Sequence, residues 1–217
     1  MNKNVVYSVI TNNYDEVLPT PDTREGWDYI LFTDSKINTT YSWRIINIDD
    51  ALRNPIKTQR SLKIFNNYIF ENYKNSIYID GNIQMLEKPE HLWSLFGSEF
   101  TLMSHPFHST LRAEQKLITD AKKDCPQKTK KQIDQYFLDG YKDIYGMVQT
   151  GIMFRQHTER VIEVCKFWLE EVIKNSHRDQ LSFNYSCWKK NFNYNLIPIH
   201  SQKLYHDTNL FKKVKCH

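Results

Sequence analysis

The run Asp80-Gly81-Asn82 offers the clearest chemistry in this sequence. Residues 76–80 (SIYID) form an apolar run that predicts a strand ending in the carboxylate of Asp80. In α/β sheets ligands bind outside the carboxyl ends of the strands, so Asp80 is expected at a binding edge. Gly81 lets the backbone turn and a ligand approach closely, while Asn82 supplies a second oxygen. Two such oxygens suit Mg²⁺ or Mn²⁺, although the same residues are also common in plain turns.

Two cations on a helix predicted over residues 55–73 could also contact a ligand. Arg60 and Lys63 stand at i and i+3, which puts both on one side of the helix. They could neutralise a diphosphate or hold a sugar there, but on its own such a pair is more typical of a solvated face. The apolar face comprises Leu62, Phe65, Ile69 and Tyr73, with Lys57, Arg60 and Lys63 largely on the other.

Alternating strands and helices must position these groups. That alternation predicts an α/β fold with a mostly parallel central sheet flanked by helices. We expect one domain over residues 1–210, with 211–217 as a basic tail or the start of a linker to further domains. The expected strands are 5–10, 27–33, 43–48, 76–80, 100–104, 145–155 (interrupted at Gly151) and 196–199. The expected helices are 55–73, 89–96, 109–123, 127–139, 157–174 and one around 181–188.

Composition narrows the class of protein. The chain has 217 residues and a net charge of +4, too mild and too evenly spread for nucleic acid to be the main partner. Its four cysteines form no CxxC pair, which argues against a zinc site or a disulfide framework. No apolar run approaches the ~20 residues that a transmembrane helix needs, and the N-terminus lacks a signal-peptide pattern. We therefore expect a cytoplasmic protein, in the host cytoplasm if it is viral.

Several ordered segments resemble one known family. Residues 76–84 (SIYIDGNIQ) resemble the (I/V)(W/Y)(I/L/V)D(G/A)N segment of GT-A glycosyltransferase-like domains found in bacteria, plants and large viruses, chlorella viruses included. Together the matching segments span most of the chain, which is far more specific than any one of them. The others are residues 5–14 (VVYSVITNNY), 27–35 (WDYILFTDS), 58–64 (TQRSLKI), 149–155 (QTGIMFR) and 178–185 (RDQLSFNY).

The resemblance implies a GT-A fold and transfer of a hexose from a nucleotide-sugar to a glycan hydroxyl. The donor of such enzymes is usually a UDP-sugar, for example UDP-glucose or UDP-rhamnose, held partly by Mn²⁺ or Mg²⁺. Asp34 would approach the base or ribose, unless it only opens a turn with Ser35. The first strand and its loop meet the nucleoside in these enzymes, which places near it Thr11, Asn12, Asn13 and Tyr14.

The metal shell is less well defined. The metal would act as a Lewis acid on the leaving diphosphate. The commoner motif is Asp-x-Asp, and the amide of Asn82 is a weaker ligand, so it could touch metal, water or sugar. A C-terminal histidine often completes the shell in related enzymes, which makes His206 and His200 candidates. Lys203 or Lys212 could reach a phosphate.

We expect transfer with inversion of configuration at the anomeric carbon, because no residue of the sequence is identified as a covalent nucleophile. It requires a general base for the acceptor hydroxyl. Asp179 is the candidate, although an Asp at a helix start is also a good N-cap. Glu114, with His105 and His108 upstream, is the competing carboxylate and could instead bind the acceptor. Gly151 is expected to leave room for the sugar.

Two rival functions stay open. A metal-dependent nucleotidyltransferase or phosphohydrolase could also use an Asp at a strand end, but the sequence has neither a GxxxxGK[ST] P-loop nor a GxGxxG fingerprint. The non-enzymatic rival is a module that binds a nucleotide-sugar without turnover, and Asn82 leaves this reading open.

Overall fold

The computed structural model describes residues 3–22, 26–38, 41–48, 54–107, 109–198, 201–206 and 208–214. Within these ranges, seven strands form a central sheet in the order β3-β2-β1-β4-β7-β6-β8, and β5 pairs with β9 in a small second sheet. The strands are β1 (Asn4–Ile10), β2 (Trp27–Thr33), β3 (Arg44–Asn47), β4 (Asn75–Ile79), β5 (Ile83–Met85), β6 (Phe100–Ser104), β7 (Val148–Gln156), β8 (Asn195–Leu196) and β9 (Phe211–Lys213).

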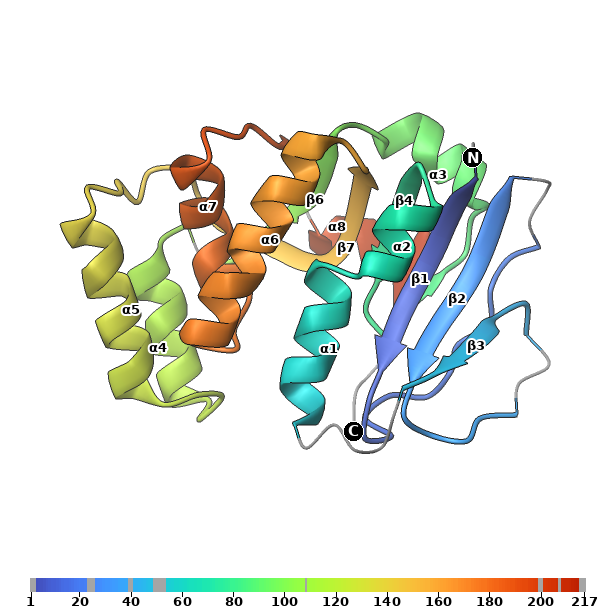
Figure 1. Ribbon diagram of the computed structural model, residues 1–217, viewed down its shortest axis with the longest axis horizontal. Helices are drawn as coiled ribbons and strands as arrows, with labels where there is room; N and C mark the ends of the chain where they lie inside the picture. Colours follow the sequence, from blue (N-terminus) through green and yellow to red (C-terminus); the bar gives the residue numbers. More distant parts are fainter. Residues whose placement is uncertain are drawn as a thin grey trace.

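Helices cover both faces of this sheet (Figure 1). Helices α1, α2, α6 and α7 contribute to the core on one face, and α3 and α8 to the core on the other. Helices α4 and α5 pack with α7 at one end of the molecule (Figure 1). The helices are α1 (Pro55–Ile64), α2 (Asn67–Asn72), α3 (Pro89–Phe96), α4 (Leu111–Asp120), α5 (Pro126–Leu138), α6 (Glu159–Lys174), α7 (Gln180–Lys189) and α8 (Ser201–His206).

The sheet is mostly parallel, as the alternation of strands and helices predicted. Strand β1 pairs in parallel with β2 and β4, β2 with β3, and β6 with β8. Strand β7 is antiparallel to both β4 and β6. The α/β fold with a central sheet flanked by helices, predicted as GT-A, is therefore confirmed. In the described ranges, no helix is both long enough and apolar enough to span a bilayer.

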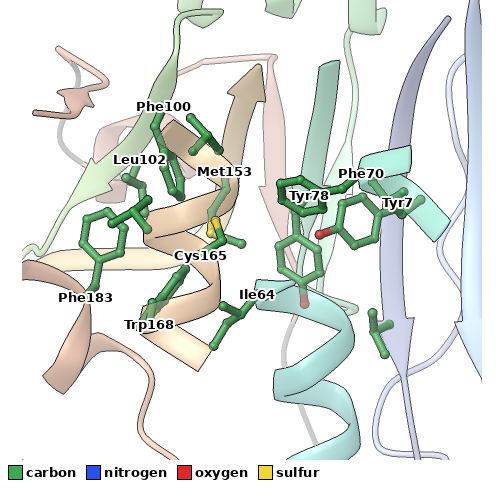
Figure 2. Close-up of a cluster of buried hydrophobic side chains, with 14 of the residues drawn as sticks. Tyr7, Ile64, Phe70, Tyr78, Phe100, Leu102, Met153, Cys165, Trp168 and Phe183 are labelled. Atoms are coloured by element: carbon green, nitrogen blue, oxygen red, sulfur yellow. The ribbon is translucent and has the colours of Figure 1, made fainter. Parts of the chain in front are cut away.

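Side chains of β1 alternate between two cores because successive residues of a strand point to opposite faces. Val5, Tyr7 and Val9 join one buried cluster, and Val6 and Ile10 join the other. Figure 2 shows part of the first cluster, which lies between the sheet and helices α1, α2, α6 and α7. The residues labelled there are Tyr7, Ile64, Phe70, Tyr78, Phe100, Leu102, Met153, Cys165, Trp168 and Phe183.

The prediction of a single helix over residues 55–73 is wrong, because this segment forms two helices. Helix α1 starts at Pro55, capped by Asn54, and ends at Ile64. Asn66 then caps α2 by accepting a hydrogen bond from the Ile69 N–H. Asn favours caps over helix interiors because its side chain competes for backbone groups. Lys63, predicted on the outer face, lies in the last turn of α1 and is buried.

Strand β7 and the C-terminal segment also differ from expectation. Strand β7 runs without a break through Gly151, and the irregularity predicted there is a shift in its pairing with β6 between Leu102 and Met103. The boundary predicted at residue 210 falls just before β9, which pairs with β5. Residues 211–213 therefore belong to the folded chain rather than to a tail. Strand β5 and helix α8 were not predicted.

Replacing Phe211 by Ala tests whether β9 belongs to the fold. Phe211 is fully buried in the core that faces α3 and α8, so truncating it leaves a cavity. We expect a loss of about 3–5 kcal/mol in the free energy of unfolding, measured by urea denaturation. Its exposed neighbour Lys212 is the control, and K212A should cost less than about 0.5 kcal/mol. Equal effects of the two substitutions would contradict the assignment.

Candidate functional site

A cavity of about 990 Å³ opens where the strands end. Strands β1 and β4 are parallel, so the residues that follow them, Thr11 and Asp80, lie at the same edge of the sheet. Strand β7 runs the other way, and its early residues, Gln149 to Gly151, therefore reach this edge as well. The backbone N–H of Asp80 donates to the Gly151 carbonyl at 2.8 Å, which ties the two segments together. One side of α1 from Pro55 to Lys63, the start of α7 and a side of α4 complete the walls.

The ammonium of Lys63 is the electrostatic centre of this cavity. Its side chain is only 2% exposed. Its Nζ lies 3.1 Å from Asp80 Oδ1, 2.9 Å from Asp179 Oδ2 and 3.2 Å from Thr150 Oγ1. An ammonium has three N–H donors, so these oxygens satisfy all of them. Lys63, predicted to bind the nucleotide-sugar, instead fixes two carboxylates of the cavity.

Asp80 is held on one side and open on the other. Its Oδ1 accepts from Lys63 and, at 2.7 Å, from the hydroxyl of Tyr78. Burial and the Asp80 carboxylate raise the pKa of Tyr78 well above its ordinary value, so Tyr78 stays a phenol that can donate. Asp80 Oδ2 accepts no hydrogen bond from any described residue, and the side chain is 32% exposed. One carboxylate oxygen thus remains available to a ligand.

Arg60 lines the cavity one turn before Lys63. Its Nε donates to the His177 carbonyl at 3.1 Å and lies 3.9 Å from Asp179 Oδ2, and its Nη1 donates to Gln59. Burial opposes the guanidinium charge, but the carboxylates of Asp179 and Asp80 outweigh it and raise the pKa of Arg60. Arg60 is therefore a fixed positive charge in the cavity that Asp80 also lines, and not part of a solvated face.

Asp179 caps α7, as its position at a helix start predicted, and it is almost fully buried. Its Oδ1 accepts from the Gln180 N–H at 3.0 Å, and its Oδ2 accepts from the Thr150 hydroxyl at 3.1 Å as well as from Lys63. Burial disfavours the charge of Asp179, yet Lys63 and Arg60 prevail and hold its pKa far below the ordinary value. A carboxylate bound so tightly is a poor proton acceptor, so this geometry does not favour Asp179 as the general base.

The two glycines make room for protein atoms. A Cβ on Gly81 would lie 2.7 Å from Asp15 Oδ2 and 2.9 Å from Ile10 Cγ1. A Cβ on Gly151 would lie 3.1 Å from Asp80 Oδ2. Gly81 therefore allows the loop after β1 to pack against the Asp80 turn, and Gly151 leaves space for the Asp80 carboxylate.

The loop after β1 is pinned by Asp34. The backbone N–H of Asn12 donates to both carboxylate oxygens of Asp34, at 2.9 and 3.0 Å. Asn12 and Asn13 have φ of 56° and 49°, the left-handed region that Asn tolerates better than most residues. Thr11, Asn12 and the exposed Tyr14 line the cavity, whereas Asn13 and Asp34 do not. Asp34 thus shapes the loop.

A histidine and a glutamate meet on the far wall. His105 Nε2 lies 3.6 Å from Glu114 Oε2, and both residues line the cavity. Glu114 is only 1% exposed. Glu114, predicted as an alternative base or as an acceptor-binding carboxylate, thus lies in the cavity beside His105, and that role stays a prediction. His108 lies outside the described residues.

Of the other residues predicted to bind the metal or a phosphate, Asn82 lies in the cavity and most of the C-terminal ones do not. Asn82 lines the cavity, and its carbonyl accepts from the Val214 N–H at 2.9 Å. His206, at the end of α8, is exposed and does not line the cavity. Lys203 and Lys212 do not line it either, but Lys213 does. His200 lies outside the described residues.

Sequence reasoning missed several members of the site. Tyr78 could have been found, because it stands two residues before Asp80 and residues i and i+2 share a face of a strand. Thr150 contacts both Lys63 and Asp179. In the sequence, only its place next to Gly151 indicated that it could belong to the site. His177 lines the cavity as well, and its Nδ1 lies 3.2 Å from Asp124 Oδ2. No spacing in the sequence indicates this pair.

Comparison with known families supports the resemblance drawn from the motifs. Residues 27–214 match the family model of the TOD1/MUCI70 glycosyltransferase-like domain. The matched range includes Arg60, Lys63, Asp80 and Asp179. Comparison with curated proteins gives no match.

Replacing Asp179 by Asn tests the buried ion pair. Removing one partner leaves Lys63 partly uncompensated, and we expect a loss of about 3 kcal/mol in the free energy of unfolding at pH 7. Because the folded-state pKa of Asp179 is depressed, its contribution is present above its unfolded pKa and is lost as pH falls through the folded value. The difference from wild type in urea denaturation should therefore shrink in acid. D120N, at an exposed position on α4, is the control. A D179N variant as stable as D120N at pH 7 would refute the pairing.

Proposed function

The chain belongs to the TOD1/MUCI70 glycosyltransferase-like domain family, and on this basis we propose that it moves a hexose from a nucleotide-sugar to a glycan hydroxyl. The family implies a sugar donor and an acceptor. The observation that carries the proposal is the cavity at the strand ends, where Arg60 and Lys63 meet Asp80. We further propose a UDP-sugar as the donor, Mn²⁺ or Mg²⁺ as the cofactor, and inversion at the anomeric carbon.

The cavity's charges suit a diphosphate. Arg60 stays protonated, and guanidinium groups bind phosphate oxygens through paired N–H donors. Lys213 and Lys123 line the same cavity and add positive charge. The nucleoside would lie along the loop after β1, against Thr11, Asn12 and Tyr14, because ligands of α/β sheets bind outside the carboxyl ends of the strands.

The residues around Asp80 fit a divalent metal. Its Oδ2 is open to the cavity, and Asp15 and Asn82 line the cavity nearby. Mg²⁺ and Mn²⁺ bind through one or two carboxylates and fill their other positions with phosphate oxygens and water. His206 does not line the cavity, so the proposed protein ligands are Asp80 and Asn82. When bound there, the metal supplies a Lewis acid for the charge on the leaving diphosphate.

The protein's own part is to hold charges in place before the reaction begins. Lys63 and Tyr78 fix the Asp80 carboxylate through its Oδ1, which orients the open Oδ2. Asp179 and the His177 carbonyl fix Arg60, so its side chain needs little reordering when a donor binds. As the bond from the anomeric carbon to the diphosphate breaks, Arg60 stabilises the negative charge that develops on the leaving group.

Replacing Asp80 by Asn tests this proposal. The amide removes the charge of the proposed metal ligand, so we expect kcat/KM to fall by at least about 100-fold. Binding of UDP-, GDP- and dTDP-sugars should be measured by calorimetry with and without Mn²⁺, and turnover by release of the nucleoside diphosphate. D120N is again the matched control.

Three outcomes would count against parts of the proposal. Transfer at full rate in excess chelator would remove the metal. Tight donor binding without any turnover, across diverse acceptors, would identify a binding module instead of a transferase. Undiminished activity in D80N would move the donor site away from the strand ends.

A further inference from the structure

The cavity contains a histidine–carboxylate pair that is separate from the cluster around Lys63. We propose that His177, oriented by Asp124, accepts the proton of the acceptor hydroxyl during sugar transfer. This inference rests on the proposed function and names the proton acceptor within the same site. His177 lies in the connection between α6 and α7, and Asp124 in the connection between α4 and α5. The pair therefore joins two segments that are far apart in the sequence.

Asp124 is rigidly held. Its Oδ2 accepts from the Ser176 hydroxyl at 2.5 Å, and its Oδ1 accepts from the Cys125 N–H at 2.7 Å. The Ser176 hydroxyl also accepts from the Arg178 N–H at 3.1 Å, so the residues on both sides of His177 are fixed. Asp124 is mostly covered, with its side chain 10% exposed. A carboxylate held in this way can set the orientation of a neighbouring imidazole.

The contact with Asp124 selects the form of the imidazole. His177 Nδ1 faces the carboxylate at 3.2 Å, which favours the tautomer with the proton on Nδ1. The lone pair is then on Nε2, which makes no hydrogen bond to any residue that the structure describes. His177 is one of the residues that line the cavity, and its side chain is 26% exposed, which leaves the imidazole accessible to a hydroxyl.

Asp179 and Glu114, the two carboxylates that the sequence offered as the general base, are less suitable for that role than His177. Both oxygens of Asp179 are engaged, by Gln180 on one side and by Lys63, Thr150 and Arg60 on the other. Glu114 is 1% exposed and lies against His105. His177 therefore combines access from the cavity with a fixed orientation, and neither carboxylate does.

Burial and the nearby cations keep His177 neutral near pH 7. Burial lowers its pKa below the ordinary value, Asp124 opposes this, and the nearby cations Arg60, Arg178 and Lys128 lower it further. A neutral imidazole is the form that can accept a proton. Activity should therefore fall in acid, as His177 becomes protonated, and the midpoint should lie below pH ~6.5.

The step balances without further reactants. The acceptor oxygen bonds to the anomeric carbon while its proton passes to His177 Nε2. The bond from the anomeric carbon to the diphosphate oxygen breaks, and the leaving group takes the electron pair away as a nucleoside diphosphate. The imidazolium, facing the Asp124 carboxylate, then returns its proton to solvent after the products leave.

The test compares H177Q with wild type. UDP release from UDP-glucose and UDP-rhamnose is measured in Mn²⁺, with water and methyl glycosides as acceptors, from about pH 5 to about pH 9. We expect kcat to fall about 10²–10⁴-fold and the acid limb of the profile to disappear, with UDP binding by calorimetry unchanged. D124N should lose about 10-fold or more and shift the acid limb to lower pH, because Asp124 raises the pKa of His177.

His91→Gln is the matched control, because His91 Nδ1 lies 3.4 Å from Glu87 Oε2 on the surface and does not line the cavity. Wild-type kcat and an intact acid limb in H177Q, with donor turnover established for wild type, would overturn the inference alone. Retention of configuration at the anomeric carbon would overturn the inference together with the proposed inversion, and would leave the proposed transfer of a sugar standing. A wild-type chain that turns over no donor would overturn the proposed function together with the inference.

Discussion

The site depends on one buried ammonium. An ion in the interior costs several kcal/mol unless partners replace the water it loses. Lys63 is 2% exposed, and the oxygens of Asp80, Asp179 and Thr150 take up its N–H donors. These oxygens come from the end of β4, the start of α7 and the early part of β7. The cation therefore fixes the relative positions of three elements that carry the proposed chemistry.

Local features of the chain bring Lys63 to that place. Helix α1 ends at Ile64 because Phe65 is extended and Asn66 caps α2, and the last two residues of α1, Lys63 and Ile64, are buried. Gly151 leaves space for the Asp80 carboxylate, and the irregular pairing of β7 with β6 falls in the same stretch. Asp179 caps α7 and pairs with Lys63 through the same carboxylate. Removing the charge of Lys63 would therefore disturb the helix cap as well as the cavity.

Much of the fold could be predicted from the sequence, because β-branched and aromatic runs mark the strands and amphipathic spacing marks α6. The position of Asp80 followed from the same patterns. The burial of Lys63 could not be predicted, since a lysine on an isolated helix pattern belongs to the solvent face until its partners are known. The pairing of His177 with Asp124 depends on how two connections meet, and no local periodicity records that. The C-terminal strand β9 was missed because its lysines suggested a tail, while its one buried residue is Phe211.

A crystal structure with UDP and Mn²⁺ would show whether the donor binds at the carboxylates that Lys63 holds. We expect the diphosphate to lie between Asp80 and Arg60, with Lys63 still bonded to both Asp80 and Asp179. A nucleotide bound elsewhere, or a Lys63 that leaves Asp179 to bind phosphate, would contradict this expectation.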